Sequence, residues 1–458
     1  MRSAAARAVT AAVRSSWAPP FAHAQLSPPA WLSASNRAAA SAPPRSSSFR
    51  HAFPIQGAGC AVTVRVGDAS PATITIGAPD AVEVWWEGAA GAGASTGAGH
   101  SPPVSATQDG PAISVIAPPG ALAPGTPLRL AIPGRYAGLD ITTAGGAVSV
   151  EGVTEAGLRV ASAGGDVCLG DARTTAAAVA TGGGALTARI LSGDDVCVST
   201  GGGDATIGRL VARTGAVDTR PGETEGERRS TTSSTGALSI NAALGDRFAF
   251  AARAPITIAT LHARETAAVT SAAGPVTLRG VDGNADVRVG APGGRISLHL
   301  LAGAAGVRVT APGGTITAAA DPVLLAGGGG GEAPGLVLLG GGAGAAGGLL
   351  CDRAAAAGAA LDARWQAACT PPAEEGEAAL AAVLSSTGRG GRGGMRGGDE
   401  DGAEVGGSGD EGSSRPLVLL DARPGGRVTL RQASWFEGAM ERAAAAGRVV
   451  GGGGGGGT

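Results

Sequence analysis

The sequence predicts an all-β protein whose centre is a parallel β-solenoid, and two observations carry that prediction. A phrase with a glycine pair and alternating apolar residues recurs with a period of about 19 residues, first at Gly145 and next at Gly164. Gly accounts for 81 of 458 residues, whereas aromatic residues make up only 3%. Small and β-branched side chains must therefore fill the core of a stacked repeat.

Two arrays carry the repeat, separated by a phase break near Pro221. The first array has evenly spaced turn glycines, which are Gly145, Gly164, Gly183 and Gly202. The second array keeps the same step and lengthens only the last one, and its anchors are Gly236, Pro255, Gly274, Gly293 and Gly313. A fixed period of about 20 residues indicates coils that stack on one another, so that equivalent strands run parallel.

Each unit is expected to contain a turn, a strand, a second turn and a second strand. Val148 and Val150 alternate in the first strand, and Leu158 and Val160 alternate in the second. The glycines are expected at sharp reversals, because Gly alone takes positive φ without strain. A single coil cannot fold alone, so both ends of the stack need covers.

Residues 1–50 have the composition of an organellar transit peptide. The first acidic residue of the chain is Asp68, and several arginines lie before it among Ala and Ser. Early arginines predict the mitochondrion as the destination, with the chloroplast as the alternative. A disordered tail is the structural alternative for this segment.

Residues 58–135 are predicted to form the N-terminal β cap, and residues 136–326 the solenoid. The cap segment contains CAVTVRV, ATITI and VEVWWE, which are strand-like but out of phase with the repeat. Trp85 and Trp86 are candidate cap or partner contacts. One ring is expected to plug the open coil, and an aromatic ligand platform is the alternative.

The C-terminal third breaks the pattern. Residues 327–414 are predicted to be a disordered, Gly- and Ala-rich insertion excluded from the core, with short helices at 352–369 and 374–384. Structure is expected to resume at 415–447 with closing strands and a short helix. That helix carries Trp435 and Phe436, again as cap or partner contacts, and residues 448–458 form a Gly tail.

Charge and cysteine usage favour no cofactor and no metal. The formal net charge of −2 gives no global field for nucleic acid or anionic membrane. Five scattered cysteines lack metal-ligand spacing and any obvious disulfide framework. Residues 333–351 carry no charge between Ala333 and Cys351, but their glycines argue against a membrane span.

Motifs for catalysis are weak. A Gly342-x-Gly344-x-x-Gly347 match is expected by chance in so Gly-rich a chain. Asp194 and Asp195 are the candidate carboxylates of a carbohydrate-cleaving β-helix. With Asp166 and Asp204 they also weakly resemble calcium-binding turns, although solvation of the turns is the simpler interpretation. His262 and His299 are expected to point outward.

The segment PLRLAIPGRYAGLDITTAGGAVSVEGV and the units after it resemble the adhesin-like domain family of unknown function. The terminal GGRVTLRQASWFEG is similar to the end of the eukaryotic family with sequence similarity 185 (member A), a mitochondrial relative. The resemblance covers 127–325 and 416–438, and the Gly-rich insertion departs from it. It implies a β-solenoid with an adhesin-like role and supplies no catalytic residues.

The leading functional hypothesis is a non-catalytic binding or scaffold module of unknown ligand, with a protein as the expected partner. The competing hypothesis is a carbohydrate-active β-helix enzyme. A third is RNA association through Arg389, Arg392 and Arg396, which lie in an Arg-Gly tract. Nucleic acid is not the expected partner, because an acidic cluster follows this tract directly.

Overall fold

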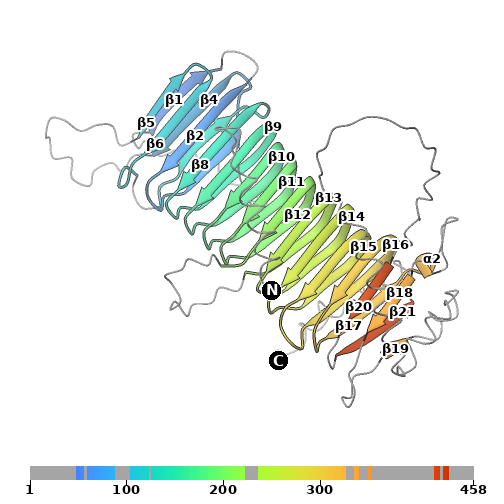
Figure 1. Cartoon of the computed structure of the whole chain (residues 1–458). Coiled ribbons are helices and arrows are strands. Elements are labelled where there is room, and N and C mark those ends of the chain that lie inside the picture. The colour runs from blue at the N-terminus through green and yellow to red at the C-terminus, as the bar shows by residue number, and fades with distance from the viewer. Residues whose placement is uncertain are drawn as a thin grey trace, which may run out of the picture. The chain divides into compact units, whose positions relative to one another are not determined.

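The computed structural model describes residues 48–55, 59–87, 104–122, 125–221, 236–325, 335–339, 349–351, 417–422 and 426–432. These residues form strands β1 to β21 and, within these ranges, one short helix, α2 (Figure 1). The chain divides into two compact units, Met1–Ala254 and Pro255–Thr458, which we call unit 1 and unit 2.

The central coils of unit 1 are long strands that lie parallel and in register (Figure 1). They are β9 (Val148–Ser162), β10 (Val167–Ala180), β11 (Leu186–Ser199), β12 (Ala205–Asp218) and β13 (Leu238–Ala252). Val167 pairs with Leu186, and Leu186 pairs with Ala205, so neighbouring strands are offset by the period of the sequence repeat. The predicted parallel β-solenoid is confirmed.

Each coil differs from the sequence prediction in one respect. It is one bent strand closed by a single glycine turn, rather than two strands separated by two turns. The ladder between β10 and β11 is interrupted twice, at Gly170 and at Thr174–Thr175, so the strand bends at both places. Because backbone pairing resumes soon after each bend, these corners need no loop.

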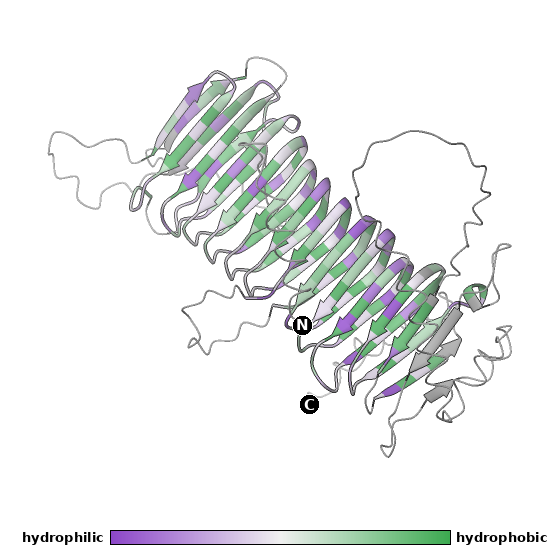
Figure 2. Cartoon of the chain, viewed as in Figure 1, coloured by the Kyte–Doolittle hydropathy of each residue, from purple (hydrophilic) through white to green (hydrophobic). Residues whose placement is uncertain are grey.

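The interior of unit 1 is built from the predicted alternating residues (Figure 2). Val148, Val150, Leu158 and Val160 are all at most 1% exposed. Burial of such side chains contributes about 1.5–3 kcal/mol each. Phe248 and Phe250 add the largest rings of the inner stack, with centroids 5.5 Å apart.

The phase break of the sequence is an excursion from one corner of the coil. Leu186 pairs with Ala205, but Ala205 pairs with Leu238, so this coil is longer than the regular step. Across the excursion, the Thr219 hydroxyl donates a hydrogen bond to the Gly236 carbonyl at 2.7 Å. The turn is thus closed over residues 222–235, which lie outside the described residues.

The N-terminal end of unit 1 continues the two ladders before it caps them. β2 (Cys60–Val66) lies parallel between β6 (Ala112–Ala117) and β8 (Ala137–Thr143), and β3 (Ala72–Ile76) lies parallel between β7 (Leu128–Ile132) and β9. The outermost pairs are antiparallel: β5 (Ser105–Asp109) with β6, β4 (Ala81–Glu87) with β7, and β1 (Ser48–Pro54) with β4. The cap strands β2 and β3 are therefore in phase with the repeat, which the sequence prediction missed.

Unit 2 repeats the same architecture with looser register. Its coils are β14 (Ile256–Ser271), β15 (Val276–Val289) and β16 (Arg295–Thr310), followed by the half-coil β17 (Thr315–Ala320). The offset between β14 and β15 is longer where Ile256 pairs with Val276 than where Val269 pairs with Val287. A bulge between Ala263 and Ala267 absorbs the difference. Helix α2 (Pro322–Leu325) packs against β16.

The C-terminal end of unit 2 is assembled out of sequence order. β20 (Leu417–Asp421) pairs with β16, and β21 (Arg427–Gln432) pairs with β17, so the predicted closing strands do complete the coil. β18 (Gly335–Leu339) pairs with the other side of β20, and β19 (Leu349–Cys351) with β21.

The prediction that the whole of residues 327–414 is excluded from the core is therefore wrong in part. Two pieces of residues 327–414, β18 and β19, extend the ladders beyond the closing strands. Their apolar sequences, GLVLL and LLC, suit a covered strand. The helices predicted at 352–369 and 374–384 lie outside the described residues.

Candidate binding face

An outward row of hydroxyl side chains runs across the coils of unit 1. The buried residues of each first half-strand flank one position that faces outward, as Val148 and Val150 flank Ser149. Register places the equivalent residues side by side. They are Thr73, Ser149, Cys168, Thr187, Thr206 and Ser239.

Unit 2 has the same row. Here too the register partners at the outward position are hydroxyl residues, and each is half-buried or exposed. They are Thr257, Thr277, Ser297, Thr317 and Thr429. We call the two rows together the outer hydroxyl column.

The outer hydroxyl column gives each unit a flat and regular surface. Adjacent coils are about 4.8 Å apart, so the hydroxyls recur at that spacing. Each hydroxyl can both donate and accept a hydrogen bond. Thr also suits a strand intrinsically, and Thr–Thr neighbours stabilise adjacent strands by about 0.2–1 kcal/mol. The column is thus able to present polar groups without weakening the sheet.

A second row of hydroxyls lies inside the coil, at the residue before each glycine turn. Each member is buried and donates to the carbonyl of the turn glycine that closes its own coil. We call it the inner hydroxyl column: Thr143, Ser162, Thr181, Thr200 and Thr219 in unit 1, and Ser271 in unit 2. Sequence reasoning missed it, although a Ser or Thr at a fixed place before a Gly repeats visibly in the first array.

The predicted turn glycines occupy two structural positions. Gly145, Gly164, Gly183, Gly202, Gly293 and Gly313 have positive φ, between 63° and 117°. Gly236 lies at the next position instead, where a Cβ would be 2.4 Å from the Gly203 carbonyl oxygen. Gly274 is also at that position, since its carbonyl accepts from Ser271. The glycines taken as anchors of the second array in the sequence therefore belong to two different positions of the turn.

The two tryptophans of the cap face opposite sides of β4. Trp86 is 2% exposed and its ring stacks on His51, with centroids 6.0 Å apart. Trp85 is half-buried on the other face. Trp86 thus fills the last coil, as a plug does. Trp435 and Phe436 lie outside the described residues.

Two of the turn acids link one coil to the next. Asp166 Oδ1 accepts a hydrogen bond from the Ala185 backbone N–H at 2.8 Å, and Asp204 Oδ1 accepts from Ala237 at 2.7 Å. Each acid therefore satisfies a backbone donor at the equivalent position of its neighbour. Their role in the described coils is structural.

Asp194 and Asp195 lie at a bend of β11, with Asp194 exposed and Asp195 half-buried. Asp195 Oδ2 is 3.7 Å from Arg213 Nη2 on the next coil. Asp171 forms an ion pair with Arg189 of the neighbouring coil. Over the described ranges, no group of three or more His, Cys, Asp and Glu side chains is placed to hold a metal ion.

The histidines behave differently from each other. His262 is outward as predicted, and its Nδ1 is 2.8 Å from Asp282 Oδ2. The prediction that His299 points outward is wrong, because His299 is only 5% exposed. It lies on β16 between Leu298 and Leu300, which are also buried, so the alternation of inward and outward residues breaks here.

Two non-glycine residues with positive φ hold equivalent places in successive coils. Tyr136 (φ 58°) precedes β8, and Glu155 (φ 62°) falls between Thr154 and Ala156, where the β9 ladder is irregular. Glu155 accepts a hydrogen bond from the Tyr136 hydroxyl, and that bond with the nearby negative charge raises the pKa of Tyr136. Such backbone strain persists only where the surrounding structure holds it.

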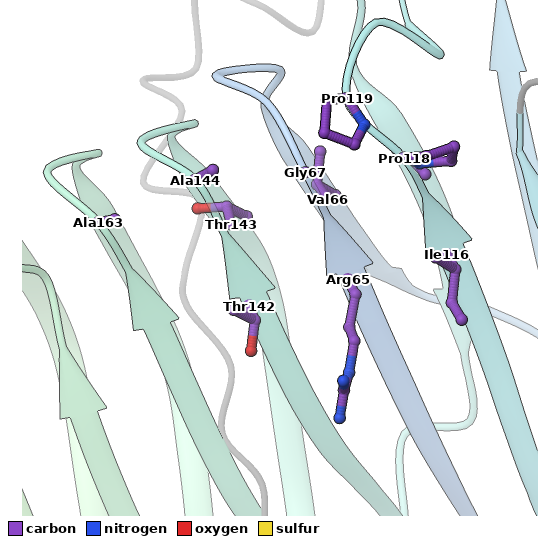
Figure 3. A pocket seen from close by; sticks show the side chains of 11 residues that line it. Arg65, Val66, Gly67, Ile116, Pro118, Pro119, Thr142, Thr143, Ala144 and Ala163 are labelled. Atoms are coloured by element: carbon purple, nitrogen blue, oxygen red, sulfur yellow. The ribbon is translucent and has the colours of Figure 1, made fainter.

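An open depression of about 530 Å³ lies on the outer side of the N-terminal strands β2, β6 and β8 (Figure 3). The neighbouring strands β6, β2 and β8 contribute Ile116, Arg65 and Thr142 to it. Arg65 is the one ionisable side chain among the eleven lining residues. The depression therefore brings no acid and base together.

Burial raises the pKa of the thiol of Cys60, and also that of Cys197, where the negative charge of Asp218 adds to the effect.

In the described part of the chain no helix is long and apolar enough to cross a membrane. No protein-family model matches the chain, and no curated protein is significantly similar to it. The adhesin-like resemblance therefore stays a prediction.

Proposed function

We propose that the protein is a non-catalytic binding or scaffold module that uses the outer hydroxyl column to hold a protein partner. The supporting observation is the column itself, in which ten of the eleven positions from Thr73 to Ser239 and from Thr257 to Thr429 are Ser or Thr and the other is Cys168. The row of hydroxyls ends where the ladders continue to Arg129 beside Thr73 and to Leu350 beside Thr429. Packing of the core does not require this choice, because the position faces outward. Within each unit the stacked sheet also holds the row of hydroxyls rigid, which lowers the entropy cost of binding.

The proposed setting is the mitochondrion, with the chloroplast as the alternative, on the basis of the acid-free, Arg-containing segment 1–50. An adhesin-like role agrees with a regular face that makes many weak contacts. The partner is expected to be a protein, because a flat face of this size suits a macromolecule better than a small ligand, which needs a concave pocket.

Proximity labelling of the full chain, with its N-terminus intact, tests this function. Thr187→Arg with Thr206→Arg places two bulky charges on the column and should remove the labelled partner. The control, Ala178→Arg with Ala216→Arg, adds two charges to the other outward ladder of unit 1, on β10 and β12 with Cys197 of β11 between them. Equal labelling by the two variants would exclude the column as the binding face.

A carbohydrate-active enzyme is the second candidate, favoured by the ion pairs Asp171–Arg189 and Asp195–Arg213, each of which links one coil to the next. Hydrolysis of a glycan that Asp194→Ala or Asp195→Ala abolishes would support it. RNA association through Arg389, Arg392 and Arg396 is tested by deleting 389–396, which lie outside the described residues. Unchanged nucleic-acid affinity after that deletion would exclude it.

A further inference from the structure

Unit 2 carries positive charge beside its part of the outer hydroxyl column. Arg295 on β16, Thr315 on β17 and Arg427 on β21 are register partners. Each lies two positions before a member of the column, so it projects on the same side of the sheet. Both arginines are exposed.

Arg295 and Arg427 differ from Arg288 of β15, which is held by Asp286 of its own strand. Within the described ranges, no carboxylate forms an ion pair with Arg295 or Arg427, and the outward residues beside them are Ser297, Thr317 and Thr429. The face therefore offers two guanidinium forks and several hydroxyls, with no acid between them.

The spacing of the two arginines selects a class of partner. They are two coils apart, which is about 9.6 Å from strand to strand. A protein segment in the extended polyproline II conformation has three residues per turn and advances about 9.3 Å in that turn. Carboxylates at positions i and i+3 of such a segment would meet both forks, whereas carboxylates at i and i+2 would not.

Other polyanions fit less well. Single-stranded nucleic acid is bound through aromatic stacking together with a basic groove, and the outward positions of β16, β17 and β21 named above hold no ring. Anionic membranes attract clusters of about 4–8 basic residues, more than the pair described here.

We propose that the face formed by Arg295, Arg427 and the intervening hydroxyls binds an extended acidic protein segment with carboxylates at every third position. This inference rests on the proposed function, because it names the chemistry of the partner held by the outer hydroxyl column.

Two synthetic peptides of identical composition test the inference, with the full chain as receptor. One repeats Asp-Pro-Pro, and the other groups the same aspartates into adjacent pairs. Fluorescence anisotropy should show tighter binding of the first, weakened about fivefold by Arg295→Gln or Arg427→Gln, the upper end for an exposed ion pair. Arg288→Gln, which breaks an existing pair, should leave its affinity unchanged.

Equal binding of the two peptides would overturn the inference, as would tighter binding of an oligonucleotide or of anionic vesicles. That failure is distinguishable from failure of the proposed function. If the column binds a partner of other chemistry, the Thr187→Arg, Thr206→Arg variant still loses its labelled neighbour while the Asp-Pro-Pro peptide does not bind. If both results are negative, the column is not a binding face.

Discussion

The Thr181 hydroxyl donates to the Gly184 carbonyl within its own turn and to the Thr200 carbonyl of the next coil, at 3.0 Å in the second case. One proton is therefore shared between the closure of one coil and the docking of its neighbour. Thr200 occupies the same place in that next coil and in turn donates to Gly203. The inner hydroxyl column thus joins local turn formation to stacking.

Removal of the Thr181 hydroxyl should be costly. Thr181→Val keeps the shape of the side chain but leaves buried carbonyls with fewer donors, which should cost about 1–3 kcal/mol. Thr187→Val, on the outer face of the next coil, should change stability by no more than about 0.5 kcal/mol. Chemical denaturation compares them, and equal midpoints would show that the inner column does not stabilise the stack.

The two glycines of one turn should respond differently to alanine. Gly183 has a φ of 117°, and a Cβ at this position would have no atom within 4 Å, so the cost of Gly183→Ala is backbone strain of about 1–3 kcal/mol. At Gly184, a Cβ would be 2.3 Å from the Gly165 carbonyl oxygen. Gly184→Ala should therefore destabilise the protein more, because two backbones must separate. The reverse order of thermal midpoints would contradict the close approach.

Deletion of residues 222–235 together with Pro221→Gly should leave unit 1 folded. The deletion joins position 221 to Gly236, and the substitution is needed because the equivalent Gly183 and Gly202 have positive φ, which proline cannot adopt. The double change recreates the short turn Thr-x-Gly-Gly of the other coils, from Thr219. Loop-closure entropy changes by only about 0.6 kcal/mol per doubling of loop length, so stability should be equal or slightly higher. Loss of the cooperative unfolding transition of the full chain after this deletion would disprove the shared period.

Tyr136 is the one tyrosine of the chain, so its titration can be followed alone by ultraviolet absorbance. Its pKa is raised by the hydrogen bond to Glu155 and by the charge of that residue. Glu155→Ala should lower the pKa of Tyr136 toward its ordinary value. The sign follows because a nearby negative charge disfavours the phenolate. An unchanged pKa would show that the pair does not form in solution.

The period, the parallel stacking and the alternating core were predictable because they are local. Val148 and Val150 alternate within one short strand, and Gly145 and Gly164 repeat at a fixed step. The bend at Gly170 was not predictable as a continuation of one strand, because a glycine inside a strand pattern reads equally well as a turn.

The C-terminal closure lay beyond sequence reasoning for a different reason. Val307 pairs with Val418 across the whole of segment 327–414, and β18 lies outside β20 although it precedes it in the chain. Strands that pair at so large a separation in the sequence leave no periodic pattern in it. The outer hydroxyl column was also missed, since a Thr at an outward strand position is common for its β propensity alone and only register shows the row.

Disulfide trapping tests the stacking most directly. Cys168 and Thr187 are register partners, so in a chain whose other four cysteines are alanine, Thr187→Cys should form a disulfide on mild oxidation. Strands about 4.8 Å apart fall within the Cα separation that a disulfide requires. Thr206→Cys, one coil further, should leave both thiols free. Oxidation of the Thr206→Cys protein but not of the Thr187→Cys protein would contradict coils stacked at the period of the sequence repeat.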